Sequence, residues 1–330
     1  MLKRCLQALQ LSTPPPDECI VVDDASSDAS AAVAAGFPVT VLGLERRGGP
    51  ARARNRGAAA ARGEVLVFLD SDVCVHADTL HRLDQRLLQD AGIAAVFGAY
   101  DDTPADPHFV SQYKNLLHHY VHHHSRTDAW TFWAGCGAMR REVFVRMGGF
   151  DEGYTRPAVE DIELGLRLHT HGLRIVLDAA IQVTHLKRWT LAALIRTDLF
   201  NRAIPWLLLM LRHRTMPSDL NMTTRDRASV VLVWIMAFAV IAWLIAPAIS
   251  GAFVATLVVL GGIGLGALNH ELYRFLARKR GVLFALRAVP LHWLAAWYCG
   301  LAVPITLLAS AWNAAVARPL VATPPRHDDG

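Results

Sequence analysis

The sequence is poor in charged side chains and poor in cysteine. Asp, Glu, Lys and Arg make up only 19% of its 330 residues, whereas hydrophobic residues make up 53%. This composition excludes a disordered chain and a protein that wraps nucleic acid, so we expect no nucleic-acid partner. The five cysteines are scattered, without a Cys-x-x-Cys pair. We therefore expect neither a disulfide framework nor a zinc knuckle.

Charge is absent altogether between Ala228 and His270. A helix of about 20 residues spans the ~30 Å hydrocarbon core of a bilayer, and a Pro-Ser-Gly break near residue 250 divides this stretch in two. A third apolar run follows near the C-terminus. We expect three membrane-spanning helices, at about residues 228–247, 251–268 and 290–312. Helices buried in a large soluble core are the alternative, but such helices need a polar face.

Basic residues gather in two segments that border these helices. The segment from Lys187 to Arg227 has eight Lys or Arg against three Asp, in a chain of net charge +4. The segment between the second and third expected helices has five basic residues and one Glu. Because positively charged loops stay inside, we expect a multi-pass protein of the cell membrane with a cytoplasmic N-terminal domain.

The N-terminal half alternates apolar strands with helices. Short runs such as ECIVVDD, EVLVFLD and RIVLDAA are separated by helix-like stretches. This pattern predicts a Rossmann-like α/β domain with a mainly parallel sheet covered by helices on both faces. Ligands of such sheets bind beyond the carboxyl ends of the strands, which is where the polar clusters DDASSD and DSD occur.

Two acidic motifs suggest catalytic chemistry. Asp70 and Asp72 follow a strand, and two carboxylates in this position suit a hard cation that bridges phosphate oxygens. Capping of a turn is the more common role of such a motif. Glu160 and Asp161 begin a helix, where acids are frequent because of the helix dipole, but an acid there could also act as a general base.

Two further loops are candidates for nucleotide binding. Asp23 and Asp24 could accept hydrogen bonds from a base or from ribose hydroxyls, while Ser26 or Ser27 could equally cap a helix. Gly48-Gly49-Pro50 begins a basic helix whose free N–H groups could bind phosphate.

In their order along the chain these motifs resemble glycosyltransferase family 2. VVDDxSxD, GGPxxARNxG, VFLDSD, GCGAMRREVFxxxGGFDE, VEDIELGLRL and HLKRW follow one another over roughly residues 1–190. The family consists of inverting nucleotide-sugar transferases with a GT-A fold. The resemblance implies a catalytic domain over 1–188. We expect it to be followed by a basic amphipathic interfacial segment over 189–227, a membrane region over 228–317 and a polar tail over 318–330. For Trp189–Met216, an ordinary amphipathic helix packed on the first domain is an equal alternative.

The resemblance also implies roles for single residues. Asp161 matches the catalytic base, and Glu160 matches its neighbour on the acceptor side. The candidates for binding the nucleotide sugar are Asp23, Asp24, Arg54, Asn55, Asp70 and Arg188. The candidates for binding the acceptor are Gly135, Cys136 and Trp189. The implied cofactor is Mg²⁺ or Mn²⁺, with Asp72, Asp70 and, as a further candidate, His185 as ligands.

The sequence departs from the family pattern in two places. His185 stands where membrane-bound members have Gln or Arg, which weakens an inference to a processive polysaccharide synthase. The family's opening strand is missing, and we expect an in-frame upstream segment to encode it.

The expected function is transfer of a sugar from a UDP- or GDP-sugar to a lipid or lipid-linked acceptor at the membrane. Transfer to a polyprenyl phosphate itself and a catalytically inactive membrane partner of the same fold are the alternatives.

Overall fold

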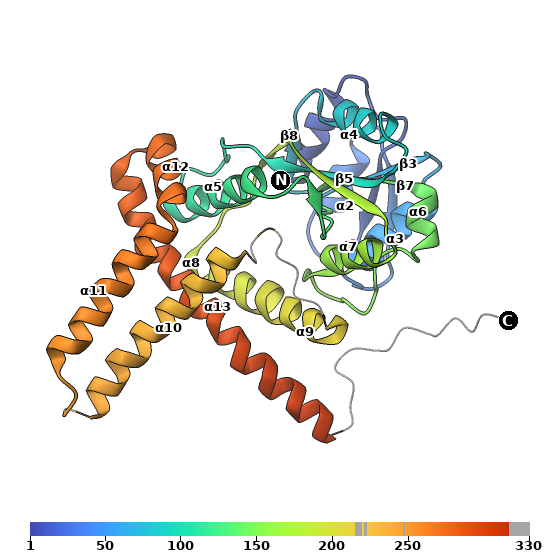
Figure 1. The fold of residues 1–330 in the computed structure, drawn as a ribbon. Helices are drawn as coiled ribbons and strands as arrows, with labels where there is room; N and C mark the ends of the chain where they lie inside the picture. Colours follow the sequence, from blue (N-terminus) through green and yellow to red (C-terminus); the bar gives the residue numbers. More distant parts are fainter. Residues whose placement is uncertain (215–219, 221–222, 247, 317–330) are drawn as a thin grey trace.

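The computed structural model describes residues 1–214, 220, 223–246 and 248–316. An N-terminal α/β domain is joined to a group of long helices that extends away from it (Figure 1). The strands are β1 (Ile20–Asp23), β2 (Thr40–Gly43), β3 (Val65–Leu69), β4 (Val73–Val75), β5 (Ile93–Tyr100), β6 (Asp128–Ala129), β7 (Cys136–Arg140) and β8 (Arg174–His185). The helices of the N-terminal domain are α1 (Leu2–Gln10), α2 (Ser30–Ala35), α3 (Pro50–Ala60), α4 (Thr79–Leu88), α5 (Phe109–His124), α6 (Arg141–Arg146) and α7 (Glu160–Thr170).

The later helices connect this domain to the apolar part of the chain. They are α8 (Leu191–Arg196), the π-helix η1 (Thr197–Ala203), α9 (Ile204–His213), α10 (Thr224–Ile245), α11 (Gly251–Leu268), α12 (His270–Arg280) and α13 (Val282–Val316). The predicted polar tail over 318–330 lies outside the described residues.

The predicted α/β class with apolar C-terminal helices is confirmed, but the pairing of the strands is mixed. β1 and β2 form a parallel pair of their own, and the other strands form a sheet in the order β3-β7-β5-β8-β4, with β6 on β8. In that sheet only β5 and β8 pair in parallel. A parallel pair needs a long crossover, usually a helix. β5 and β8 are separated by such helices, whereas β4 pairs antiparallel with β8, and β7 lies antiparallel between β3 and β5.

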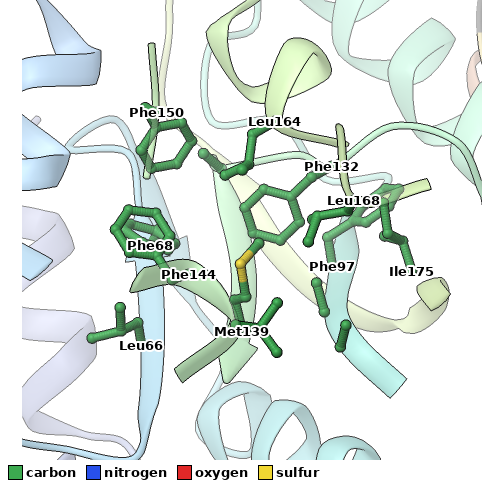
Figure 2. Packing of buried hydrophobic residues seen from close by; sticks show 14 of the residues in the cluster. Leu66, Phe68, Phe97, Phe132, Met139, Phe144, Phe150, Leu164, Leu168 and Ile175 are labelled. Atoms are coloured by element: carbon green, nitrogen blue, oxygen red, sulfur yellow. The ribbon is translucent and has the colours of Figure 1, made fainter. Parts of the chain in front are cut away.

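A cluster of buried aromatic and aliphatic side chains joins the sheet to α7. Phe68 of β3 lies edge-on to Phe150 and Phe132, with ring centroids 5.1 and 6.2 Å apart (Figure 2). Met139 of β7 and Leu164 of α7 are fully buried in the same cluster. Truncating a buried Phe typically costs about 3–5 kcal/mol, so this packing fixes the end of β3 against the start of α7.

Three helices are long and apolar enough to span a membrane: Thr224–Ile245, Gly251–Leu268 and Val282–Ser310. The first begins earlier than predicted because Thr223 and Asp226 form a capping box that takes charged residues into the first turn. The third also begins earlier, since Pro290 lies inside α13 and does not end it.

The connector α12 packs against the N-terminal domain. Phe275 stacks on His119 of α5 with ring centroids 5.7 Å apart. Lys279 forms an ion pair with Asp102, and Arg280 donates to Gln112 at 2.8 Å. The α11–α13 connector and the N-terminal domain therefore lie against each other (Figure 1).

We predict that Gly165→Ala destabilises the N-terminal domain. A Cβ at Gly165 would lie 2.6 Å from the carbonyl carbon of Thr131 and against the amide nitrogen of Phe132, both backbone atoms. Forced overpacking of this kind costs about 1–3 kcal/mol, measurable by chemical denaturation in detergent. In Gly43→Ala the new Cβ has no neighbour within 4 Å, so this control should change stability by less than ~0.5 kcal/mol. Equal stability of the two variants would contradict the prediction.

Candidate active site

The acidic motifs, which are far apart in sequence, meet in one cavity of about 380 Å³. Its lining includes the carboxylates Asp70, Asp72, Glu160 and Asp161 and the cations Arg54, Lys187 and Arg202. The carboxylates come from the end of β3 and from the first turn of α7, which the core holds side by side. The sequence prediction that these acids share one site agrees with this geometry.

Arg54 of α3 joins the two acidic motifs. One guanidinium nitrogen donates to Asp70 Oδ1 at 2.8 Å and another donates to Glu160 Oε1 at 2.8 Å. The guanidinium also lies 5.5 Å from the ring centroid of Phe150. The Arg54 side chain is 17% exposed and that of Glu160 only 5%, so water does little to screen this ion pair. One cation thus holds Asp70 and Glu160 together.

Asp161 lies next to this ion pair, and its surroundings raise its pKa. Burial raises the pKa of Asp161 to about 6, the neighbouring Glu160 adds to the rise and Arg54 opposes it. The N–H of Ala134 donates to Asp161 Oδ2 at 3.2 Å. A carboxylate with a pKa near the working pH is well suited to take a proton from a substrate.

Asp72 is ionised more readily than Asp161. Burial alone would raise the pKa of Asp72, but His185 and Lys187 outweigh it and hold the pKa below its ordinary value. Nε2 of His185 lies 3.5 Å from Asp72 Oδ2, while Nδ1 contacts Asn115 Oδ1. Because both ring nitrogens face these partners and the ring is buried, the geometry favours a role for His185 in orienting Asp72.

Asp70 and Asp72 fit a divalent cation. Both carboxylates are partly exposed toward the cavity, and Mg²⁺ or Mn²⁺ is commonly held by one or two carboxylates together with substrate phosphates and water. Among the described residues no group of three His, Cys, Asp or Glu could hold a metal, so substrate oxygens would have to complete the coordination.

Three predicted donor-binding residues make local contacts instead of lining the cavity. Asp24 accepts hydrogen bonds from the N–H groups of Gly48 and Gly49 at 2.6 and 2.9 Å, and Asp23 accepts from the N–H of Ser26 at 3.2 Å. Asn55 bonds to both the N–H and the carbonyl of Phe150, at 2.9 and 2.8 Å. These contacts hold the loop before α3 and the loop that contains Phe150 in place.

The predicted acceptor-binding residues and Arg188 also lie outside the cavity lining. The Gly135 carbonyl accepts from the Asp70 N–H at 3.2 Å, and Cys136 is buried in β7. Trp189 is buried in an apolar cluster with residues of α5, α12 and α13. Arg188 is 64% exposed and lies 4.0 Å from Asp106. Their proposed roles in substrate binding remain predictions.

The sequence did not identify several cavity-lining residues on β5, α5 and η1. They are Tyr100, His118, His122, Thr197, Asn201 and Arg202, and Lys187 joins them from the end of β8. The i,i+4 spacing of the histidines is visible in the sequence, but it suggested a solvated or interfacial helix face, whereas His118 and His122 are buried. Arg202 could only be assigned to the interfacial segment, because its approach to the acids depends on tertiary packing.

A second hollow, of about 510 Å³, lies between α5 and the α12–α13 turn. Phe109, Phe284, Arg280 and Arg287 are among its lining residues. It is lined by no carboxylate of the described chain, so the smaller cavity is the candidate active site.

Comparison with known proteins identifies the domain. Residues 1–148 match the family model described as glycosyl transferase family 2, and residues 115–188 match one described as the N-terminal domain of galactosyltransferase. The first 148 residues are thus similar to glycosyltransferase family 2. A structure of similar fold is a mannosyltransferase from Pyrobaculum calidifontis, PcManGT, in complex with GDP-Man and Mn²⁺. It has a TM-score of 0.57 and 20% identity, and the match covers 89% of this chain and 83% of that one.

Curated relatives in this family match shorter segments. The succinoglycan biosynthesis protein ExoO of Rhizobium meliloti is 46% identical over 72 residues, which cover 21% of each protein. Validoxylamine A glucosyltransferase of Streptomyces hygroscopicus subsp. limoneus is 28% identical over 213 residues, covering 52% of this chain and 46% of that enzyme. The chain therefore spans about half or less of the curated relatives that it matches.

We predict that Arg54→Met lowers stability because it leaves Asp70 and Glu160 without their shared cation. Removing one partner of a buried ion pair costs about 3 kcal/mol, the lower end of the usual range, since Asp70 is partly exposed. Chemical denaturation at neutral pH measures the loss. The control is Arg56→Met, an exposed arginine on the same helix, which should stay within ~0.5 kcal/mol of the parent protein. A similar loss in both variants would mean that helix propensity, not the ion pair, is responsible.

Proposed function

We propose that this protein is a membrane-bound inverting glycosyltransferase. It transfers a sugar from a UDP- or GDP-sugar to a hydroxyl group of a lipid or lipid-linked acceptor. The observation that carries the proposal is the position of Asp161, with a pKa of about 6, in the same cavity as Asp70 and Asp72. The raised pKa lets the Asp161 carboxylate accept a proton, while the carboxylates of Asp70 and Asp72 are available to bind a cation.

The donor would bind at the end of β3. Asp70 and Asp72 would hold Mg²⁺ or Mn²⁺, and the bound ion would neutralise charge on the leaving diphosphate. The Mn²⁺ and GDP-Man in the mannosyltransferase complex support this choice by analogy. Asp23 and Asp24, which shape the loop before α3, remain our candidates for contact with the nucleoside.

Asp161 would act as the general base. The acceptor hydroxyl gives its proton to the Asp161 carboxylate while its oxygen forms a bond to the anomeric carbon. The bond from that carbon to the diphosphate oxygen breaks on the opposite face, so the configuration inverts. General-base help of this kind contributes about 10²–10⁴-fold. Glu160 accepts from Arg54 and from the N–H of Ala158 at 2.9 Å, so we assign it a positioning role.

The apolar helices support an acceptor in the membrane. Because α12 packs on α5, the N-terminal domain would lie on the same side of the bilayer as the basic connector between α11 and α13. Because loops rich in Lys and Arg stay on the cytoplasmic side of the membrane, that side is the cytoplasm. We therefore place the protein in the cell membrane with its cavity close to the cytoplasmic headgroups.

We predict that Asp161→Asn abolishes sugar transfer and leaves nucleotide affinity nearly unchanged. Asn keeps the size of the side chain but cannot take a proton. In the parent enzyme, protonation of Asp161 removes the base, so kcat/KM should fall about tenfold per pH unit below pH 6 and level off above it. A pH-rate series with calorimetry of UDP and GDP binding tests both statements. An active Asp161→Asn enzyme would instead favour transfer to a polyprenyl phosphate, an acceptor that needs no base.

We predict that Asp72→Asn loses Mn²⁺ binding together with activity, because an amide is a weaker ligand for a hard cation than a carboxylate. Electron paramagnetic resonance of Mn²⁺ in the presence of nucleoside diphosphate gives the binding directly. Asp78→Asn is the control, because Asp78 is exposed and, among the described residues, forms its ion pair with Arg82 on the surface. Turnover that remains sensitive to EDTA in Asp72→Asn would refute the metal assignment.

A further inference from the structure

One side of the cavity is lined by residues that belong neither to the proposed metal site nor to the proposed general base. His118 and His122 come from α5, Lys187 from the end of β8 and Arg202 from η1, and all four line the cavity. We call these four residues the cationic wall. Lys187 stands within the HLKRW motif and the other three lie outside the quoted family motifs. The chemistry proposed above uses none of the four as base or metal ligand.

Neither cation of this wall forms a close ion pair with a described residue, although Lys187 lies near Asp72 and Asp70, and Arg202 lies near Asp161. The Arg202 guanidinium makes no hydrogen bond or ion pair with any described residue, although it is only partly exposed. The ammonium of Lys187 lies 4.2 Å from the ring centroid of Trp189, and the Lys187 side chain is only partly exposed. Two half-buried cations that repel each other are costly unless an anion joins them.

His118 adds an unused hydrogen-bonding group. It is 5% exposed, and neither ring nitrogen has a partner among the described residues. Burial, with Lys114 and Arg202 adding to it, lowers the pKa of His118 well below its ordinary value. The ring is therefore neutral and has one N–H to donate. Since a buried polar group is normally hydrogen-bonded, this N–H also points to a ligand.

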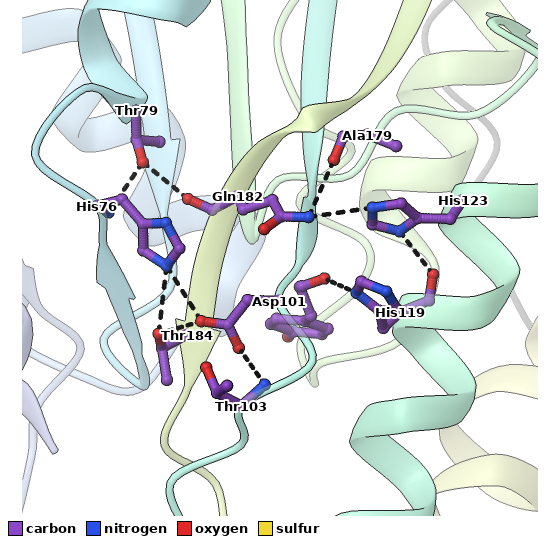
Figure 3. A network of polar contacts seen from close by, with 10 residues as sticks. His76, Thr79, Asp101, Thr103, His119, His123, Ala179, Gln182 and Thr184 are labelled. Atoms are coloured by element: carbon purple, nitrogen blue, oxygen red, sulfur yellow. Dashed lines mark hydrogen bonds and ion pairs between the residues drawn. The ribbon is translucent and has the colours of Figure 1, made fainter. Parts of the chain in front are cut away.

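The position of α5 is fixed by polar contacts on its other side. His119 Nδ1 lies 2.8 Å from the Tyr100 carbonyl, and His123 Nε2 lies 3.0 Å from Gln182 Nε2 of β8 (Figure 3). The ring of Tyr100 in turn stacks on His118, with centroids 5.7 Å apart. These contacts with β5 and β8 fix the position of the cationic wall in the cavity.

The η1 part of the cationic wall is held by α13, one of the helices expected to span the membrane. Asp198 of η1 accepts from Lys114 of α5 at 2.7 Å and from the Tyr298 hydroxyl of α13 at 2.9 Å. All three residues are buried. A ligand that enters from the bilayer along α13 would therefore meet η1 and Arg202. π-Helical segments such as η1 are frequent at functional sites.

We propose that the cationic wall binds the phosphate group of a phosphorylated lipid, the acceptor of the transfer. Lys187 and Arg202 bind the phosphate oxygens, and His118 donates a further hydrogen bond. The sugar hydroxyl of a lipid-linked acceptor is then held near Asp161. This inference rests on the proposed function for its ligand, but the binding site itself does not require that transfer occurs.

The test is binding of polyprenyl phosphate and of uncharged polyprenol to the full chain in phosphatidylcholine nanodiscs. We expect polyprenyl phosphate to bind at least about tenfold more tightly than polyprenol, the difference expected for one or two charge-assisted hydrogen bonds. Arg202→Gln and Lys187→Gln should each remove most of this difference, and Arg202→Gln should leave the Kd values of UDP and GDP with Mn²⁺ unchanged. Arg196→Gln, an exposed arginine one turn earlier, should bind like the parent protein.

Three results would overturn the proposal. Equal affinity for the two lipids would exclude a phosphate site, and equal competition by phosphatidylglycerol would reduce it to attraction by an anionic surface. A loss of nucleotide affinity in Arg202→Gln and Lys187→Gln, without a loss of lipid affinity, would assign the wall to the donor diphosphate. The assay contains no sugar nucleotide donor. If the lipid-phosphate preference holds while Asp161→Asn leaves transfer unaffected, the site stands and the base assignment falls.

Discussion

The candidate active site depends on one guanidinium. Four carboxylates line a small cavity, and at neutral pH their mutual repulsion would push β3 and α7 apart. Arg54 bonds to Asp70 and to Glu160 at the same distance, and so converts two repelling groups into a bridged pair. Asp161 is left outside this bridge, and its pKa rises because burial and Glu160 outweigh Arg54. The same interaction thus holds the site together and separates the acids into different roles.

The aromatic core beneath the site makes this bridge possible. Phe150 packs on Phe68 of β3 and also lies under the Arg54 guanidinium, while Asn55 clamps both backbone polar groups of Phe150. A shift of the loop before α7 would therefore move the cation and the core together. Apolar packing therefore sets the positions of the polar side chains of the site. A sequence motif does not reveal this packing.

The sequence predicted the α/β class, the apolar helices and the acids that share the cavity, because strand periodicity, lack of charge and acids at strand ends are local signals. It did not predict the antiparallel β7, since CGAMR lacks the β-branched residues typical of strands. Nor did it predict that Trp189 turns into an apolar cluster or that Arg202 reaches the acids. Both depend on long-range packing of η1 and α13, which leaves no trace in neighbouring residues.

The long apolar helix α13 contacts an element that lines the site. Lys114, Asp198 and Tyr298 form a buried polar group that joins α5, η1 and α13. A buried ion pair contributes little net stability and is sensitive to geometry, because the cost of desolvation is recovered only when every partner is in place. Loss of the Tyr298 bond would leave Asp198 paired with Lys114 alone, in the same η1 segment that bears Arg202. The cavity-lining segment η1 is thus tied to the long apolar helix α13 through Asp198.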